Sequence, residues 1–157
     1  MRTFRHWHLI VLFGSLIGVF SCQSGVVYQD HQAVPIAGWH YNDGIVFEAT
    51  LHDTLSLHEL YLDVRNTTDY PYRNLFLFLE IAFPDDRVLR DTIECVLADN
   101  RGNWTGSGFG YIRFNRYLFR DEVWFPVAGT YTFTIYQGMR ETELAGIADV
   151  GIRIDGK

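Results

Sequence analysis

Cysteine is nearly absent from this chain. Only Cys22 and Cys95 occur among 157 residues, and they form no Cys-x-x-Cys pair. A disulfide framework is therefore excluded as the source of stability. The chain has to be stable through packing alone, and its length suits one domain with its own hydrophobic core.

An excess of positive charge is also missing. The formal net charge is −6, and no stretch of the sequence forms a basic patch. An acidic domain repels phosphate backbones, so we do not expect nucleic acid as a partner. The same repulsion argues against direct adhesion to anionic lipid headgroups.

Long apolar runs are missing after residue 22. The run from Leu9 to Phe20 is the longest, and at about a dozen residues it is too short for a bilayer span, which needs roughly 20. The most apolar later run, Leu75 to Phe83, is short and contains Glu80. It is typical of a buried strand rather than of a membrane span.

The residues on either side of the first apolar run indicate what kind of segment it is. Arg2 and Arg5 precede it, and the small residue Ser21 follows it directly before Cys22. A positive start, an apolar core and a small residue at the cut are the parts of a secretory signal peptide. The cysteine after the small residue resembles the lipobox of bacterial lipoproteins, in which the cut falls before the cysteine and that cysteine carries the lipid.

The lipobox departs from the usual pattern at Phe20, where Ala or Ser is more common. Two alternatives stay open, an ordinary signal peptide cut elsewhere and a buried N-terminal strand. On the lipoprotein interpretation residues 1–21 are the signal peptide, 22–35 are the lipidated N-terminus and tether, and 36–157 are one domain. Residues 26–28 could instead belong to a first, edge strand.

A lipidated Cys22 would hold the protein on a membrane without spanning it. Two or more acyl chains, such as palmitate, anchor stably, whereas a single chain binds only marginally. The residues after Cys22 lack the acidic cluster that resembles a surface-export signal in some lipoproteins. We therefore expect an outer-membrane lipoprotein that faces the periplasm.

The rest of the chain favours strands. Aromatic residues make up 16% of the sequence, and Thr, Val and Ile are frequent. Strand patterns occur over 45–51, 58–64, 75–83, 88–97, 111–119, 129–137 and 147–154, with a short strand at 122–125 and one helical turn at 139–144. Turn residues separate these segments. We predict an antiparallel β-sandwich of about eight or nine strands, of immunoglobulin-like or jelly-roll type.

Alternation also assigns faces to side chains. It places Tyr61, Asp63 and Arg65 outward, and it places Cys95 in the core as a small hydrophobe. Both faces of 75–83 carry apolar residues, so we expect that strand to be covered on much of both faces. Tyr131 follows Gly129-Thr130 at the start of a strand, which is consistent with a tyrosine corner or with plain core packing.

Signals for catalysis are weak. No HExxH, Cys-x-x-Cys…His, Gly-x-Ser-x-Gly or phosphate-loop pattern occurs, so we expect no enzyme, no metal and no cofactor. Solvated turns explain the His52–His58 and 99–103 segments better than metal sites do. Five aromatic residues in or beside predicted loops remain as a possible contact surface for a glycan or a protein partner: Trp39, Tyr70, Tyr72, Trp104 and Trp124. The alternative is that these residues plug the open ends of the sandwich.

Several blocks of the sequence resemble the GldH family of gliding-motility lipoproteins. The resemblance begins at the lipobox and is most specific over residues 64–77, Val-Arg-Asn-Thr-Thr-Asp-Tyr-Pro-Tyr-Arg-Asn-Leu-Phe-Leu. Further blocks are Gly38-Trp39-His40, Val46-Phe47-Glu48, Phe83-Pro84-Asp85, Leu97-Ala98-Asp99, Gly102 with Trp104, Gly106 and Gly108, Phe125-Pro126, Gly129 to Phe133, Gln137 with Met139-Arg140, and Gly146 to Ile154. Together they cover nearly the whole chain after Cys22.

The resemblance implies an outer-membrane lipoprotein needed for gliding and associated with the motility and type IX secretion apparatus. It implies no catalytic residue. We therefore expect a lipid-anchored, non-enzymatic sandwich that docks on an envelope protein complex. The alternative is a carbohydrate-binding sandwich of the outer membrane that uses its aromatic loops.

Overall fold

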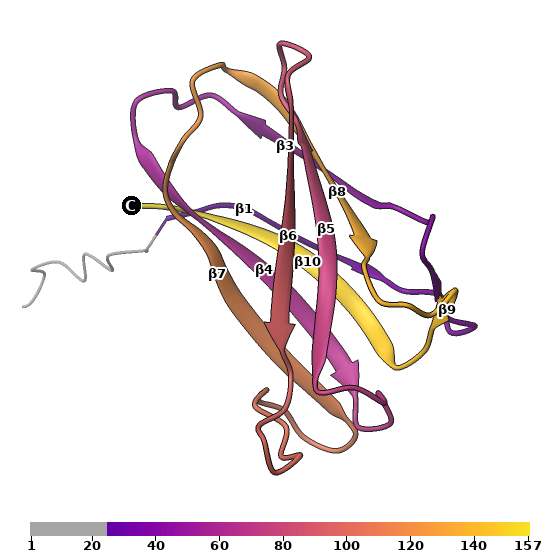
Figure 1. Cartoon of the computed structure of the whole chain (residues 1–157). Coiled ribbons are helices and arrows are strands. Elements are labelled where there is room, and N and C mark those ends of the chain that lie inside the picture. The colour runs from indigo at the N-terminus through magenta and orange to yellow at the C-terminus, as the bar shows by residue number, and fades with distance from the viewer. Residues whose placement is uncertain (1–24) are drawn as a thin grey trace, which may run out of the picture.

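The computed structural model describes residues 25–157, in which two four-stranded antiparallel sheets pack together and a small third sheet has two strands (Figure 1). The first sheet has the order β1 (Val26–Ala33), β10 (Ile147–Gly156), β4 (Leu57–Thr67), β7 (Ile112–Trp124). The second has the order β3 (Ile45–Leu51), β8 (Gly129–Gln137), β5 (Asn74–Ala82), β6 (Val88–Val96). The predicted β-sandwich is confirmed, and we call the two layers the β4 sheet and the β5 sheet.

The core lies between the two sheets because each strand turns every second residue inward. In β8 the inward residues are Tyr131, Phe133 and Ile135, and all three are fully buried. In β10 the residues Ile152 and Ile154 face them from the other layer. Each such side chain contributes about 1.5–3 kcal/mol through removal from water, so this alternation is the main source of stability in a domain without disulfides.

Strand positions agree with the prediction, with two differences. The segments expected at 111–119 and 122–125 form the single long strand β7, whose pairing with β4 shifts register near Leu60. The prediction of a helical turn over Met139–Leu144 is wrong. Glu143–Leu144 instead form β9, which pairs with β2 (Trp39–His40), so that Trp39 lies opposite Leu144.

Residues Val26–Ala33, at the start of the described chain, form a strand. The full length of β1 pairs with β10, from Val26 opposite Asp155 to Ala33 opposite Asp149. The sheet thus begins at Val26, before the domain boundary expected at residue 36. The signal peptide and Cys22 lie outside the described residues. Over residues 25–157 no helix has the length and apolar character needed to cross a membrane.

Candidate functional site

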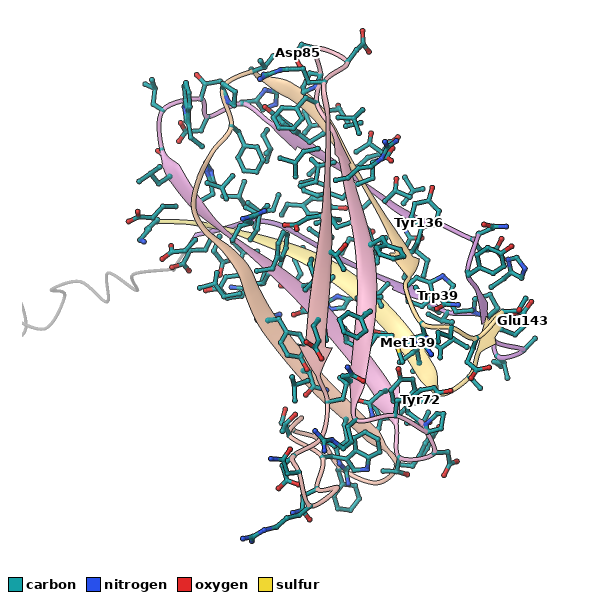
Figure 2. The ribbon with its side chains drawn as sticks, in the orientation of Figure 1. Trp39, Tyr72, Asp85, Tyr136, Met139 and Glu143 are labelled. Atoms are coloured by element: carbon teal, nitrogen blue, oxygen red, sulfur yellow. The ribbon has the colours of Figure 1, made fainter. Side chains whose placement is uncertain are left out.

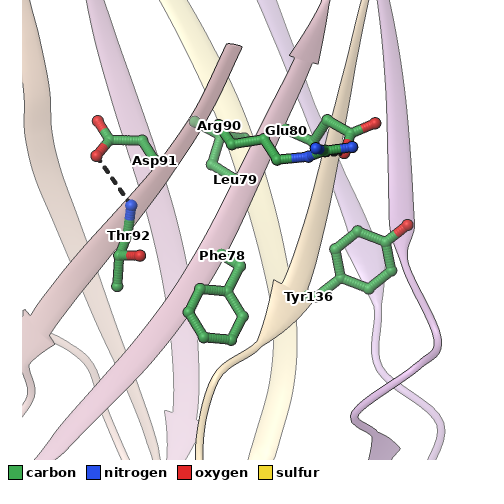
Figure 3. Close-up of a pocket in the computed structure, with 7 residues that line it drawn as sticks. All are labelled: Phe78, Leu79, Glu80, Arg90, Asp91, Thr92 and Tyr136. Atoms are coloured by element: carbon green, nitrogen blue, oxygen red, sulfur yellow. Dashed lines mark hydrogen bonds and ion pairs between the residues drawn. The ribbon is translucent and has the colours of Figure 1, made fainter. Parts of the chain in front are cut away.

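The outer face of the β5 sheet carries a hollow of about 480 Å³ beside Phe78 and Tyr136 (Figure 3). The two residues are register partners, on β5 and β8. Phe78 is 48% exposed although it sits in the middle of a central strand. The strand is therefore covered on one face only, and the expectation that both faces are covered is wrong at this position.

Local sequence explains why the two rings are presented side by side. Phe78 and Tyr136 alternate with the buried residues Leu77 and Ile135, so both rings must leave the sheet on its outer side. Gly44 makes room for Tyr136, because a Cβ at position 44 would lie 2.7 Å from the tyrosine ring. The aromatic pair is thus built by strand register and one small neighbour.

Charged groups border the aromatic pair. Arg90 Nε donates a 2.7 Å hydrogen bond to Glu80 Oε2 across β5 and β6. Asp91 and Thr92 lie further along β6, where the Asp91 carboxylate accepts a hydrogen bond from the Thr92 N–H at 2.9 Å. A flat aromatic surface beside exposed donors and acceptors suits binding of a polar ligand or a protein segment.

A second hollow, of about 510 Å³, continues from the same two rings toward the loop at 138–142. Gln137 fixes that loop: its Oε1 accepts from the Met139 N–H at 2.8 Å and its Nε2 donates to Glu141 O at 2.7 Å. The Tyr72 hydroxyl donates a hydrogen bond to the Glu141 carboxylate. Figure 2 shows Tyr136, Met139 and Tyr72 along this side of the molecule. The two hollows form one continuous surface, which we call the aromatic groove.

The outer face of the β4 sheet has a different character. One row of register partners crosses its four strands: His31, Gly151, Asp63 and Arg116. Asp63 is 0% exposed, and its carboxylate accepts two hydrogen bonds from Arg116, both 2.7 Å long. His31 Nε2 lies 2.9 Å from the same carboxylate. Hydrogen bonding to Asp63 raises the pKa of the Arg116 guanidinium above its usual value.

Gly151 is required for this row. The His31 ring lies across β10 at the glycine, and a Cβ at position 151 would come within 2.4 Å of the ring. The absence of a side chain lets His31 reach Asp63 from two strands away. All charges in the row are paired, so we assign the row to the stability of the sheet rather than to chemistry.

The five aromatic residues singled out in the sequence are not brought together. Trp39 and Tyr70 are buried, and Tyr72 and Trp104 are half-buried against the core. Trp124 is 57% exposed, but it lies at the far end of β7 from the loop that holds Trp104. Phe78 and Tyr136 were missed as site residues; register pairing of two outward aromatics, which needs the strand order, is the signal that finds them.

Reactive groups are sparse among residues 25–157. Cys95 is buried as predicted, and burial raises the pKa of its thiol to about 12. No group of three or more His, Cys, Asp or Glu side chains in this part of the chain is arranged to hold a metal ion. The geometry therefore offers surfaces for binding, and it offers no assembled nucleophile or metal centre in the described residues.

These features define a class, an antiparallel β-sandwich domain with an open aromatic groove on one sheet. The sequence profile described as GldH lipoprotein matches residues 26–154. A "Gliding motility lipoprotein GldH homolog" of Christiangramia forsetii is 34% identical over 154 residues, 94% of each chain. The "Gliding motility lipoprotein GldH" of Flavobacterium johnsoniae is 31% identical, over 94% of this chain and 95% of the relative. The chain belongs to the GldH lipoprotein family.

Proposed function

We propose that this protein is a lipid-anchored, non-enzymatic component of the gliding-motility and type IX secretion machinery. Family membership is the observation that carries the proposal, because a relative of similar length is named a gliding motility lipoprotein. The lipid is attached to Cys22 after removal of residues 1–21. The sandwich is held at the outer membrane and faces the periplasm.

The anchor and the domain have separate tasks in this proposal. The lipid on Cys22 confines the domain to the membrane surface, which raises its effective concentration near other envelope proteins. The domain provides a rigid binding surface, the aromatic groove, whose exposed Phe78 and half-buried Tyr136 are the kind of anchor residues found in protein interfaces. The partner is an envelope protein of the same machinery.

Two genetic experiments test the proposal. Deletion of the gene is expected to abolish gliding, and secretion is scored separately to tell the two roles apart. Cys22→Ser is expected to leave the β domain folded while membrane retention and function are lost. A Cys22→Ser protein that sediments with membranes and supports gliding would contradict the anchoring role.

A pull-down tests the docking role. The native lipoprotein is extracted in mild detergent, and its copurifying envelope proteins are compared with those of Tyr136→Ala and Phe78→Ser. Phe78 is exposed and Tyr136 is half-buried, and both side chains lie outside the core, so folding is expected to persist. Thr50→Ala is the matched control, because Thr50 is an exposed residue of the same sheet outside the groove. Loss of partners in the groove variants alone is the expected result.

Glycan binding is the second candidate function, and the aromatic groove is the observation that favours it. Flat aromatic rings stack on sugars, and Arg90, Glu80 and Thr92 stand beside Phe78 and Tyr136 to bond hydroxyl groups. Recovery of no envelope partner, together with glycan binding lost in Tyr136→Ala, would favour this candidate. Trp104→Ala is a second variant for the glycan-binding assay. It tests whether the aromatic loops singled out in the sequence bind the glycan.

A further inference from the structure

The end of the sandwich where the chain enters β1 exposes an apolar surface. Leu55 is 89% exposed and Trp124 is 57% exposed. Three further apolar side chains nearby have between two fifths and half of their area exposed: Val26, Val27 and Leu57. Large apolar side chains that are exposed together are typical of a surface that contacts a protein or a membrane. We call these five residues the proximal apolar surface.

Strand register brings Val26, Leu57 and Trp124 to one end, with Val27 next to Val26. Gly25 O accepts a 2.8 Å hydrogen bond from Gly156 N, Gly156 pairs with His58, and the preceding Leu57 pairs with Trp124. Adjacent strands are about 4.8 Å apart, so the Trp124 backbone lies about 14 Å from Gly25. Figure 1 shows the start of β1 and the C-terminus on the same side of the molecule.

Leu55 is exposed by an ordered loop. Asp53 Oδ1 accepts hydrogen bonds from the backbone N–H of Leu55 at 2.8 Å and of Ser56 at 3.0 Å. Trp124 Nε1 donates to Thr54 O at 2.5 Å, which ties the loop to the end of β7. Both large apolar side chains are thus held in place on the outside of the domain, at the cost of exposure to water.

The proposed lipid attachment point, Cys22, is close in sequence to this surface. Cys22 precedes Gly25 by three residues. Three residues span at most about 11 Å even when fully extended. We propose that the proximal apolar surface rests on the lipid bilayer, with Leu55 and Trp124 inserted at the headgroup level. The proposal rests on the proposed lipidation of Cys22, and it adds a second contact that fixes how the domain stands on the membrane.

The charges around the proximal apolar surface determine which lipid headgroups it can approach. Asp53, Asp121 and Glu122 surround the surface, and Lys157 pairs with both Asp121 and Glu122, at 2.8 and 3.2 Å. The carboxylates outnumber the single cation, so an anionic headgroup layer would be repelled. The occupant is therefore a zwitterionic lipid surface, which an exposed tryptophan and leucine can enter without opposition from net charge.

This seating directs the rest of the molecule. β7 runs for 13 residues from the opposite end to Trp124. At about 3.3 Å per residue it places the loop with Phe109 roughly 40 Å along the strand from Trp124, at the end remote from the proposed membrane contact. The aromatic groove then opens sideways above the bilayer, where an envelope partner can reach it.

Site-directed fluorescence tests the proposal. The mature lipoprotein is made as Leu55→Cys and as Phe109→Cys, labelled with an environment-sensitive maleimide dye, and reconstituted into phosphatidylcholine vesicles. Phe109 is 100% exposed in the fold, so it is the matched control for Leu55 at the other end. Cys95 is buried and does not compete for the dye. Quenching is measured with acrylamide from the water and with headgroup nitroxide lipid from the bilayer.

The expected result is a loss of acrylamide quenching and a gain of nitroxide quenching for the label at 55, with neither change at 109. Equal quenching at the two positions overturns the proposal. Protection from acrylamide without nitroxide quenching means that a second copy of the chain covers the surface, and this also overturns it. Stronger nitroxide quenching after phosphatidylglycerol is added would contradict the preference for zwitterionic lipid.

Failure of the anchor and failure of the seating give different results. Without lipid on Cys22, the N-terminal peptide has no added mass and the protein does not float with the vesicles, which defeats the proposed function. With lipid present and the protein floating, equal quenching at 55 and 109 defeats the seating alone.

Discussion

Arg116 holds the carboxylate of Asp63 with two parallel hydrogen bonds of 2.7 Å on the outer face of the β4 sheet. The Asp63 side chain is 1% exposed, whereas the Arg116 side chain is 31% exposed. The anion is thus buried in a layer of side chains that cover it from neighbouring strands, and the cation keeps contact with water. Removal of one partner is therefore expected to cost a different amount of stability from removal of the other.

Arg116→Ala is expected to destabilise the protein more than Asp63→Asn. Loss of Arg116 leaves a buried carboxylate with only His31 beside it, at a cost of about 3 kcal/mol. Loss of the Asp63 charge leaves an arginine that regains water, at about 1 kcal/mol. Urea unfolding measures both. Arg90→Ala is the control, because the Arg90–Glu80 pair is exposed and is worth less than about 1 kcal/mol. Equal losses in the first two variants would contradict this account.

Gly151→Ala is expected to cost about 1–3 kcal/mol through overpacking. The new methyl group would lie 2.4 Å from the His31 ring and 2.6 Å from Asp30 O, so the ring must leave Asp63. Gly156→Ala on the same strand is the control, because its nearest neighbour would be 3.6 Å away. Thermal unfolding of the two variants gives the comparison, and a Gly151→Ala protein as stable as Gly156→Ala would show that the row tolerates a side chain.

Tyr131→Phe is expected to cost about 1 kcal/mol. The Tyr131 hydroxyl donates to Val127 O at 2.8 Å and accepts from Val127 N at 3.3 Å, so the residue forms a tyrosine corner as well as part of the core. Tyr136→Phe is the matched control on the same strand, because it removes an outward hydroxyl of the aromatic groove. Chemical denaturation that gives the same stability for both variants would remove the corner from the sources of stability.

Strand positions were predictable because the pattern that creates them is local. The alternation over 45–51 and 129–137 reproduces the bounds of β3 and β8, since burial of every second side chain is written in the sequence. Cys95 and the inward residues of β10 follow from the same period. What alternation cannot give is the order of strands in a sheet, because that depends on contacts between residues far apart in the chain.

The missed features all depend on that order. Asp63 was correctly placed outward, but its burial comes from Arg116 and His31 on other strands. Phe78 becomes a surface residue because no further layer covers the β5 sheet among residues 25–157. The segment 139–144 lacks a strand pattern, yet its last two residues form β9 by pairing with β2, where Trp39 lies opposite Leu144. Each case is a tertiary contact that overrides a local preference.

Asp53, in the loop that carries Leu55, is expected to contribute to stability at neutral pH, and this contribution is expected to be lost in acid. Hydrogen bonds from the Ser56 hydroxyl and from the N–H groups of Leu55 and Ser56 lower the pKa of Asp53 to about 2, from 3.8. Because the folded pKa lies below the unfolded one, this contribution is complete above about pH 5 and disappears as the pH falls through about 2.

The measurement compares wild type with Asp53→Ala between pH 2 and pH 6. The difference in unfolding free energy is expected to stay constant above about pH 5 and to shrink at lower pH. Asp99→Ala serves as a second case, since hydrogen bonds from Asn103 also lower the pKa of Asp99. A difference at Asp53 that grows on acidification would contradict the sign.

Thiol counting tests the cysteine chemistry and the anchor in one experiment. The chain has two cysteines, and the Cys95 thiol is buried with its pKa raised to about 12. A thiol reagent at neutral pH is expected to leave the native mature lipoprotein unmodified, because the thiolate is the reactive form. In denaturant it should modify one thiol per chain, that of Cys95, because the proposed lipid caps Cys22.

The control is the protein produced without its signal peptide but with Cys22 retained. It should show one reactive thiol in the native state and two in denaturant, because Cys22 is then free and Cys95 is still buried. Cys95→Ala of the lipidated protein should show none in either state. Two reactive thiols in the denatured mature lipoprotein would mean that Cys22 carries no lipid, and the anchor would then have to lie elsewhere in the chain.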